Sequence, residues 1–242
     1  MVNHHIHAEL ARERQRTLLA EAGIRAKHVR WLRQQAGTPG ARRSPFRWLA
    51  GGRSAAGGRR VVLRDGSAVL IRPVQSADAP LLADGFARLS ARSRQMRFLT
   101  RKKELSPAEL RYLTDVDHHD HEALGALDHA DGRGVGIARY VRDAADPRAA
   151  EIAVTIVDDW QGRGLGTELL SRLTDRARQE GIRRFTALVS ADNVAMAGLL
   201  RNVSAGLVRR EPGTVAYEIT LAPGEAHGHA WLAQLLGALP TG

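Results

Sequence analysis

The chain has 242 residues, of which 43% are apolar and 26% are charged, as in an ordinary folded globular protein. It contains no cysteine, which excludes disulfides, thiolate catalysis and cysteine-based zinc sites. No apolar run approaches the roughly 20 residues that span a bilayer, and the N-terminus lacks the apolar stretch of a secretory signal. We therefore expect a cytoplasmic protein without a membrane span.

The formal net charge of +10 lies entirely in the first quarter of the chain. Residues 1–60 hold 13 Lys and Arg against three Glu, whereas residues 61–242 hold 23 basic and 23 acidic residues. We expect a basic arm, partly helical over 8–35 and linker-like over 36–60, attached to a neutral body. Such an arm suits contact with a polyanion, and a basic tail without a partner is the equally weighted alternative.

The body, residues 61–222, carries strand and helix patterns whose order predicts a mixed α/β (α+β) sheet. The order is helices, an antiparallel meander and then a βαβα segment, and residues 223–242 form a tail without an assigned role. Helices are expected over 76–90, capped by Ser76, from Ser106, and over 164–180 and 194–203. Strands are expected at 61–63, 69–71, 123–127, 135–141, 151–157, 185–189, 207–210 and 215–221.

The most specific motif is a glycine-rich loop between a predicted strand and a predicted helix. Glycines at alternate positions allow a tight turn and bring backbone N–H groups close to a ligand. The helix N-terminus adds unpaired donors and partial positive charge, which suit a pyrophosphate. The spacing fits neither a P-loop nor a dinucleotide fingerprint, and a plain strand-to-helix turn is the structural alternative. The loop consists of Gln161, Gly162, Arg163, Gly164, Leu165, Gly166 and Thr167.

The stretch that ends in this loop resembles the core motif of the GNAT superfamily of acetyltransferases. That motif reads Gln/Arg-x-x-Gly-x-Gly/Ala, and Gln161, Gly164 and Gly166 occupy its fixed positions. Asn193 matches the Asn that opens the next helix in the family. The resemblance covers about residues 61–221 and implies the GNAT fold, a mixed central sheet flanked by helices.

A narrower similarity is to the catalytic domains of bacterial protein-lysine acetyltransferases. It rests on Ser90-Ala91-Arg92-Ser93-Arg94, Arg97-Phe98 and the segments 117–122 and 138–143. In such proteins the domain is often attached to a cyclic-nucleotide-binding or acyl-CoA-synthetase-like module. The 60 preceding residues are too few for either module, so regulation by one is not expected.

The resemblance implies acetyl-CoA as the cosubstrate and places it on the chain. Its pantetheine would pair with the strand around Val154, Thr155 and Ile156, as an added strand would. Its pyrophosphate would lie on the glycine loop, and Asn193 would approach the pantetheine. Arg163 is weighed equally as a phosphate ligand and as an exposed loop arginine.

Acetyl transfer to an amine needs a base, because a lysine with a pKa of about 10.4 is almost wholly protonated at pH 7. Glu151 is the candidate, since strand alternation places it with Ala153 and Thr155 on a face of small residues. The lysine acetyltransferases that the chain resembles have their catalytic glutamate at this place, and an exposed strand-start residue is the alternative. No tyrosine follows Asn193 where many family members have one, so the general acid is unassigned.

The segment from Asp117 to Glu122 is rich in His and Asp, but consecutive residues rarely form a metal site without partners elsewhere. We interpret it as a polar loop on the acceptor side and expect no metal. The sequence thus predicts acetyl transfer from acetyl-CoA to a primary amine, with a protein lysine as the favoured acceptor. A small-amine acetyltransferase and a non-catalytic acyl-CoA sensor with an anion-binding arm are the alternatives. The oligomeric state is not predicted.

Overall fold

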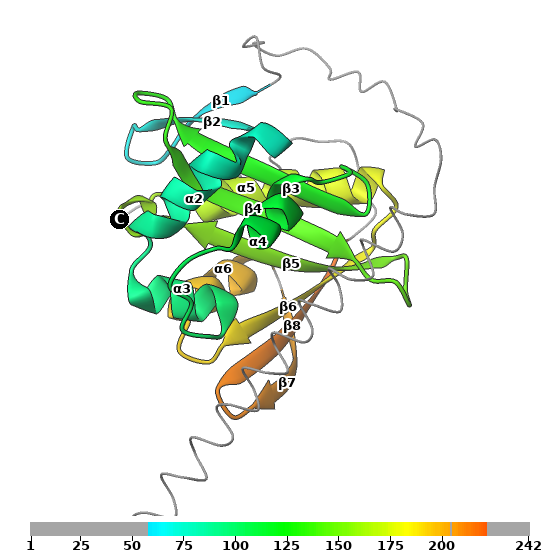
Figure 1. The fold of residues 1–242 in the computed structure, drawn as a ribbon. Coiled ribbons are helices and arrows are strands. Elements are labelled where there is room, and N and C mark those ends of the chain that lie inside the picture. Colours follow the sequence, from blue (N-terminus) through cyan, green and yellow to red (C-terminus); the bar gives the residue numbers. More distant parts are fainter. Residues whose placement is uncertain (1–57, 204, 222–242) are drawn as a thin grey trace, which may run out of the picture.

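The computed structural model describes residues 58–203 and 205–221, which form one eight-stranded sheet with helices on both faces (Figure 1). The predicted helical stretch over 8–35, nearly all of the linker and the C-terminal tail lie outside these residues. No helix within the described ranges is long and apolar enough to cross a membrane. The predicted mixed α/β sheet is confirmed.

The strands lie in the order β1-β2-β3-β4-β5-β6-β8-β7, and only β5 and β6 are parallel neighbours. The first five strands form the antiparallel meander, and α5 provides the crossover to β6. The strands are β1 (Arg59–Val62), β2 (Ala68–Pro73), β3 (His121–Asp128), β4 (Gly134–Arg142), β5 (Ala149–Ile156), β6 (Arg184–Ser190), β7 (Gly206–Glu211) and β8 (Thr214–Thr220).

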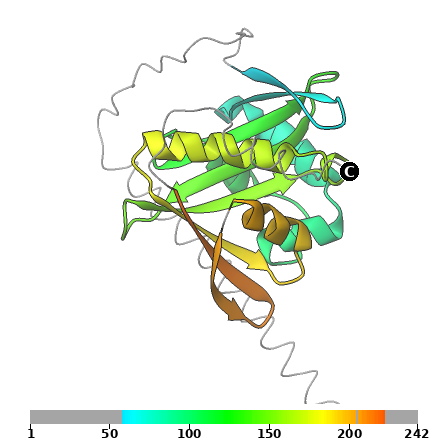
Figure 2. The ribbon, with the colours of Figure 1, turned by 180° about the vertical axis from the view of Figure 1, so that it is seen from behind.

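The helices are divided between the two faces of the sheet. Figure 1 shows α2, α3 and α4 in front of it, and Figure 2 shows α5 and α6 covering the opposite face. Ser106 precedes α4 as predicted and forms a capping box there, because Ser106 and Glu109 exchange side-chain to backbone hydrogen bonds. The helices are α2 (Ala79–Arg88), α3 (Ala91–Phe98), α4 (Pro107–Thr114), α5 (Leu165–Gln179) and α6 (Val194–Asn202), with short 3-10 turns at Ser76–Asp78 and Asp158–Trp160.

The start of α2 and the presence of α3 differ from the prediction. Ser76 does not cap a helix; Gln75 precedes the 3-10 turn, and the Asp78 carboxylate accepts a hydrogen bond from its N–H at 2.8 Å. Ser90, predicted to close the first helix, instead caps α3 by accepting from the N–H of Ser93 at 3.1 Å. Most residues of α3 are Arg, Ser or Gln, so the helix lacks the apolar stripe by which periodicity identifies helices.

The main hydrophobic core lies between the sheet and α5. Leu165, Leu169, Leu173 and Ala177 are buried along one face of this helix, as their spacing predicts. They join one contiguous cluster with the inward side chains of the strands, among them Tyr140.

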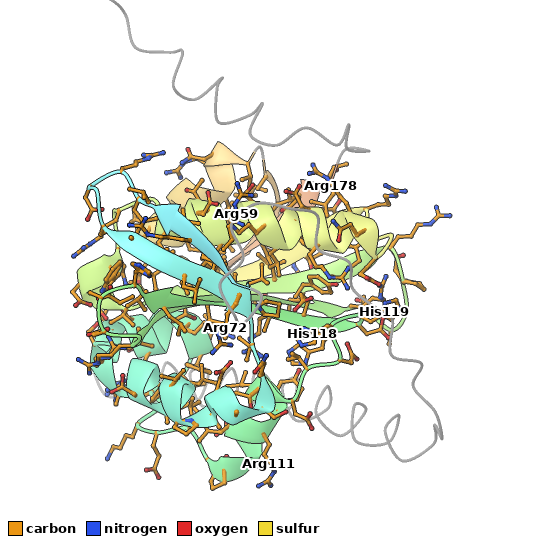
Figure 3. The ribbon with its side chains drawn as sticks, turned by 90° about the horizontal axis from the view of Figure 1, so that it is seen from above. Arg59, Arg72, Arg111, His118, His119 and Arg178 are labelled. Atoms are coloured by element: carbon orange, nitrogen blue, oxygen red, sulfur yellow. The ribbon has the colours of Figure 1, made fainter. Side chains whose placement is uncertain are left out.

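The same face holds a network of ion pairs around two buried side chains, Glu122 and Arg176. Nε of Arg176 lies 3.2 Å from Oε2 of Glu122, whose other oxygen lies 2.7 Å from Nδ1 of His118. Arg176 also pairs with Glu180, which contacts His119 in turn. His118 and His119 lie at one end of the sheet (Figure 3). The His- and Asp-rich segment therefore anchors a loop to α5, and among the described residues no group of His, Asp and Glu side chains could hold a metal ion.

Candidate active site

β5 and β6 diverge in the middle of the sheet (Figure 1). They pair through only three residue pairs, from Ala149–Arg184 to Glu151–Thr186. Beyond Glu151, β5 continues to Ile156 paired only with β4, and β6 continues paired only with β8, in the part of the chain that the structure describes. Backbone N–H and C=O groups on this side of β5 therefore face a gap, which an extended ligand can fill as an added strand would.

The glycine loop lies at the carboxyl end of β5 and leads into α5. Gly162 and Gly164 have φ angles of +77° and +91°, which glycine adopts without strain. Gly164 is the N-cap residue of α5, so the N–H groups of residues 165–167 lack acceptors within the helix and lie at its positive end. The Gln161 side chain fixes the start of the loop by donating from Nε2 to the carbonyl of Ile156 at 3.0 Å.

The gap and the loop line one large cavity of about 570 Å³, whose other walls come from α3 and α6. Asn193 caps α6, since its Oδ1 accepts from the N–H of Met196 at 3.0 Å, and this bond fixes the orientation of its amide. Ten of the eleven predicted cofactor residues line this cavity: Val154, Thr155, Ile156, Gln161, Gly162, Gly164, Leu165, Gly166, Thr167 and Asn193.

Arg163 is the residue of that set that does not line the cavity. Its guanidinium lies 4.7 Å from the centre of the Trp160 ring and forms an ion pair with Asp65 at 3.1 Å. Arg64 lines the cavity instead, and its Nε lies 3.4 Å from the position that a Cβ on Gly164 would take. Sequence reasoning missed Arg64 because it reaches the loop from the distant turn between β1 and β2, which no motif marks.

Asp158 attaches α3 to the glycine loop. Its carboxylate accepts hydrogen bonds from the N–H of Ser90 at 2.9 Å and from the hydroxyls of Ser90 and Ser93 at 2.8 and 2.7 Å. Burial opposes its charge, but these hydrogen bonds outweigh it and hold the pKa of Asp158 below its usual range. The attachment brings Arg92 and Arg97 of α3 to the wall of the large cavity.

A second groove of about 600 Å³ lies at the other end of β5, between α4, the β4–β5 loop and β6. Glu151 is exposed and lines this groove, whereas the next residue, Ile152, is buried in the core, as strand alternation predicts. Tyr112 also lines it, while the other two tyrosines, Tyr140 and Tyr217, are buried. Acidic residues predominate around the groove: Asp117, Asp120, Asp143, Glu151 and Glu180 stand against Arg142.

His121 is buried in the wall of this groove, with 2% of its surface exposed. Nη1 of Arg139 lies 3.1 Å from its Nε2, and because arginine can only donate, Nε2 accepts and the proton lies on Nδ1. Nδ1 has no hydrogen-bond partner within the described chain. Burial, reinforced by the charges of Arg139 and His118, lowers the pKa of His121 to about 3, so the ring is neutral at pH 7.

A sheet that opens between two parallel strands, with a glycine loop at a helix N-terminus beside the opening, defines the class of acyl-CoA-dependent N-acetyltransferases. The family model for the acetyltransferase (GNAT) domain matches residues 68–205. The chain therefore belongs to the GNAT family, and it is an acetyltransferase that uses acetyl-CoA as its cosubstrate.

Relatives of known name agree with this assignment. The chain is 44% identical over 139 residues to an acetyltransferase of Pseudomonas aeruginosa, an alignment that covers 57% of this chain and 74% of that protein. It is 34% identical to acetyltransferase Pat of Mycolicibacterium smegmatis over 67% of this chain, but it spans only 49% of Pat. The solved GNAT domain of S. lividans PAT matches with a TM-score of 0.64 and 30% identity, over 70% of this chain and 99% of that domain.

Proposed function

We propose that this acetyltransferase acts on a primary amine, with a protein lysine as the favoured acceptor and Glu151 as the general base. The position of Glu151 carries the proposal. It is the last residue of β5 that pairs with β6, so it lies where the gap for the cofactor begins. It also lines the acidic groove, which is open to an acceptor. Glu151 therefore lies on β5 between the start of the gap and the acidic groove.

The residues around the large cavity fit the parts of acetyl-CoA. The N–H groups of residues 165–167 and the guanidinium of Arg64 suit the pyrophosphate. The backbone of β5 between Ile152 and Ile156 suits the amide groups of the pantetheine, and Asn193 lies across the cavity from it. Acetyl-CoA supplies the activated thioester. With the pantetheine bound along β5, the acyl end would lie beside this strand.

The acidic groove suits a cationic acceptor. Five carboxylates and one arginine give its wall a negative formal charge, in a body whose overall charge is close to zero. Such a potential attracts lysine-bearing segments and speeds their association at low ionic strength. A lysine in a basic peptide therefore fits better than a lysine in an acidic one.

The chemistry required of Glu151 is removal of one proton. Glu151 takes a proton from the acceptor ammonium through an intervening water, which frees the nitrogen lone pair to attack the thioester carbonyl. The C–N bond forms, the C–S bond breaks, and a thiolate of pKa about 8.5 leaves. The attacking nitrogen loses its second proton, which passes through water to that thiolate, and Glu151 returns its own proton to the solvent. Burial raises the pKa of Tyr112, so this groove residue stays protonated at neutral pH, but we assign it no role.

A peptide assay tests the choice of acceptor. Peptides with one lysine in a basic or an acidic surrounding are incubated with the protein and acetyl-CoA, with a Lys-to-Arg peptide as the control. We expect Nε-acetylation in mass spectra at a rate about tenfold higher for the basic peptide, and a smaller difference at high salt. Binding of acetyl-CoA without turnover of any amine would instead support the acyl-CoA sensor.

A further inference from the structure

A smaller cavity of about 90 Å³ lies between the sheet and helices α2–α4. Its walls are mostly apolar, with Phe86, Phe98 and Leu113 among them. It shares Thr155 and Arg97 with the large cavity, so the two spaces meet at β5. Its size admits a short group of a few heavy atoms rather than a second whole molecule.

Of the charged residues that line this cavity, Arg72 and Asp78 form an ion pair, whereas Arg97 and Arg139 do not pair with a carboxylate in the described residues. Nη2 of Arg72 lies 2.6 Å from Oδ1 of Asp78, which neutralises both groups. Within the described residues, the hydrogen-bonding partners of Arg139 are the neutral His121 ring and the carbonyl of Leu113, at 3.1 and 2.9 Å.

Two positive charges without an anion in these surroundings are costly. Burial lowers the pKa of Arg97 to about 10, and burial together with the charge of Arg97 lowers the pKa of Arg139 to about 9. Both guanidiniums nevertheless remain charged at pH 7, so they cannot relieve the cost by losing a proton. A bound anion would relieve it, and a carboxylate matches the planar fork of arginine.

We propose that Arg97 and Arg139 form a carboxylate-binding subsite at the acyl end of the cofactor cavity. The inference rests on the proposed function, because it takes the thioester to lie on β5 beside Ala153, which is paired with Arg139 in the strand register. Two substrates can supply the carboxylate. One is an acyl group with a terminal carboxylate, such as succinyl, whose methylene groups would lie against the apolar walls. The other is a small acceptor with both an amine and a carboxylate, such as an amino acid.

The bonds that form and break are the same whether the carboxylate belongs to the acyl group or to the acceptor. The amine nitrogen forms a bond to the thioester carbon, the C–S bond breaks with its electron pair on sulfur, and the amine proton ends on the CoA thiol. The carboxylate itself does not react, so its only effect is on binding and orientation.

Two substrate comparisons locate the carboxylate. The donor comparison uses succinyl-CoA against butyryl-CoA, which has the same chain length without the charge, with one amidated lysine peptide as the acceptor. The acceptor comparison uses free L-lysine against cadaverine, which lacks only the carboxylate, with acetyl-CoA as the donor. We expect kcat/KM to favour the carboxylate substrate by at least about tenfold in one comparison, and that comparison identifies the source.

The variants Arg97→Met and Arg139→Met should abolish this preference. For Arg139→Met, which changes a residue outside the lining of the large cavity, acetyl transfer to the amidated peptide should change less than about threefold. Arg97→Lys should retain part of the preference, and Arg101→Met, which removes an exposed cation outside both cavities, should retain all of it. The absence of a preference in both wild-type comparisons, or a preference that survives both Met variants, would overturn the subsite. If the wild type does not acetylate the peptide at all, the proposed function fails instead.

Discussion

The two faces of the sheet solve the problem of buried charge in opposite ways. On the α5 face, Glu122 and Arg176 are almost fully buried, yet each meets an opposite charge. On the α2–α4 face, Arg97 and Arg139 lack a carboxylate, and the buried Nδ1 of His121 lacks any partner in the described chain. Satisfied groups stabilise a fold, whereas buried groups left unsatisfied raise its energy and mark where a ligand binds. We infer that the α5 face maintains the structure and that the α2–α4 face meets the substrates.

The largest effect is expected from Glu151→Gln, which should lower activity without lowering stability. Gln keeps the shape but cannot accept the proton, so the rate at pH 7 should fall by about 10² to 10⁴ while acetyl-CoA affinity stays near wild type. The deficit should shrink at high pH, where the amine is already deprotonated. Because Glu151 is exposed, the free energy of unfolding should change by less than about 0.5 kcal/mol. A pH–rate profile with one good acceptor decides this, and wild-type turnover at pH 7 would remove Glu151 from the chemistry.

Arg176→Met should produce the reverse pattern, a loss of stability. It leaves the carboxylate of Glu122 buried beside His118 without its arginine, which costs about 3 to 5 kcal/mol in the free energy of unfolding. Arg97→Met removes a cation that has no carboxylate partner, so it should leave stability within about 1 kcal/mol of wild type or raise it. Urea unfolding followed by circular dichroism measures both. Equal losses in the two variants would contradict the distinction between the faces.

His121 should make the protein sensitive to acid. Its pKa of about 3 in the folded state lies below the unfolded value of about 6.5, so its contribution to stability is complete above pH 6.5 and is lost as the pH falls below that value. Between pH 7.5 and pH 5.0 the wild type should lose about 2 kcal/mol more than His121→Gln, whose amide oxygen can still accept from Arg139. Unfolding titrations at the two pH values measure this difference, and parallel losses would show that His121 is accessible to protons.

Backbone strain at the two ends of α5 offers the mildest test. Gly164 and Gly181 both have positive φ angles, +91° and +77°, but only Gly164 lines the large cavity. Gly164→Val should therefore weaken acetyl-CoA binding at least about tenfold, or 1.4 kcal/mol, whereas Gly181→Val should leave affinity unchanged at a similar cost in backbone strain. Calorimetric titration of both folded variants measures the difference. An unchanged affinity in Gly164→Val would remove the loop from the site.

The elements that the sequence predicts are those whose causes are local. The apolar stripe of α5 and the start of α4 at Ser106 each depend on neighbouring residues. The helix α3 was missed because its position is set by Asp158, 65 residues away from Ser93 in the sequence. Hydrophobic periodicity carries no information about such a contact.

The candidate site also combines residues that local sequence patterns identify with residues that only the tertiary structure brings to the cavity. The glycine loop and the alternation that exposes Glu151 are local patterns, and the structure brings the loop residues together around one cavity. Arg64 reaches that cavity from another element, so no motif identifies it. Arg97 belongs to the residues of the narrower similarity, but its place in the cavity wall depends on how α3 packs. Arg163 belongs to the motif, yet Trp160 and Asp65 occupy its side chain.

The short seam between β5 and β6 has a mechanical consequence. In the described chain, strand pairing joins the wing formed by β6, β8 and β7 to the five-stranded remainder of the sheet through only three residue pairs. A ligand bound in the opening would bridge β5 and β6 where they are not paired. The wing should therefore move more freely relative to the rest of the sheet in the ligand-free protein than in the ligand-bound one. We expect the rigidity of the sheet to change in each catalytic cycle, since it would decrease when the product leaves and increase when the next cosubstrate binds.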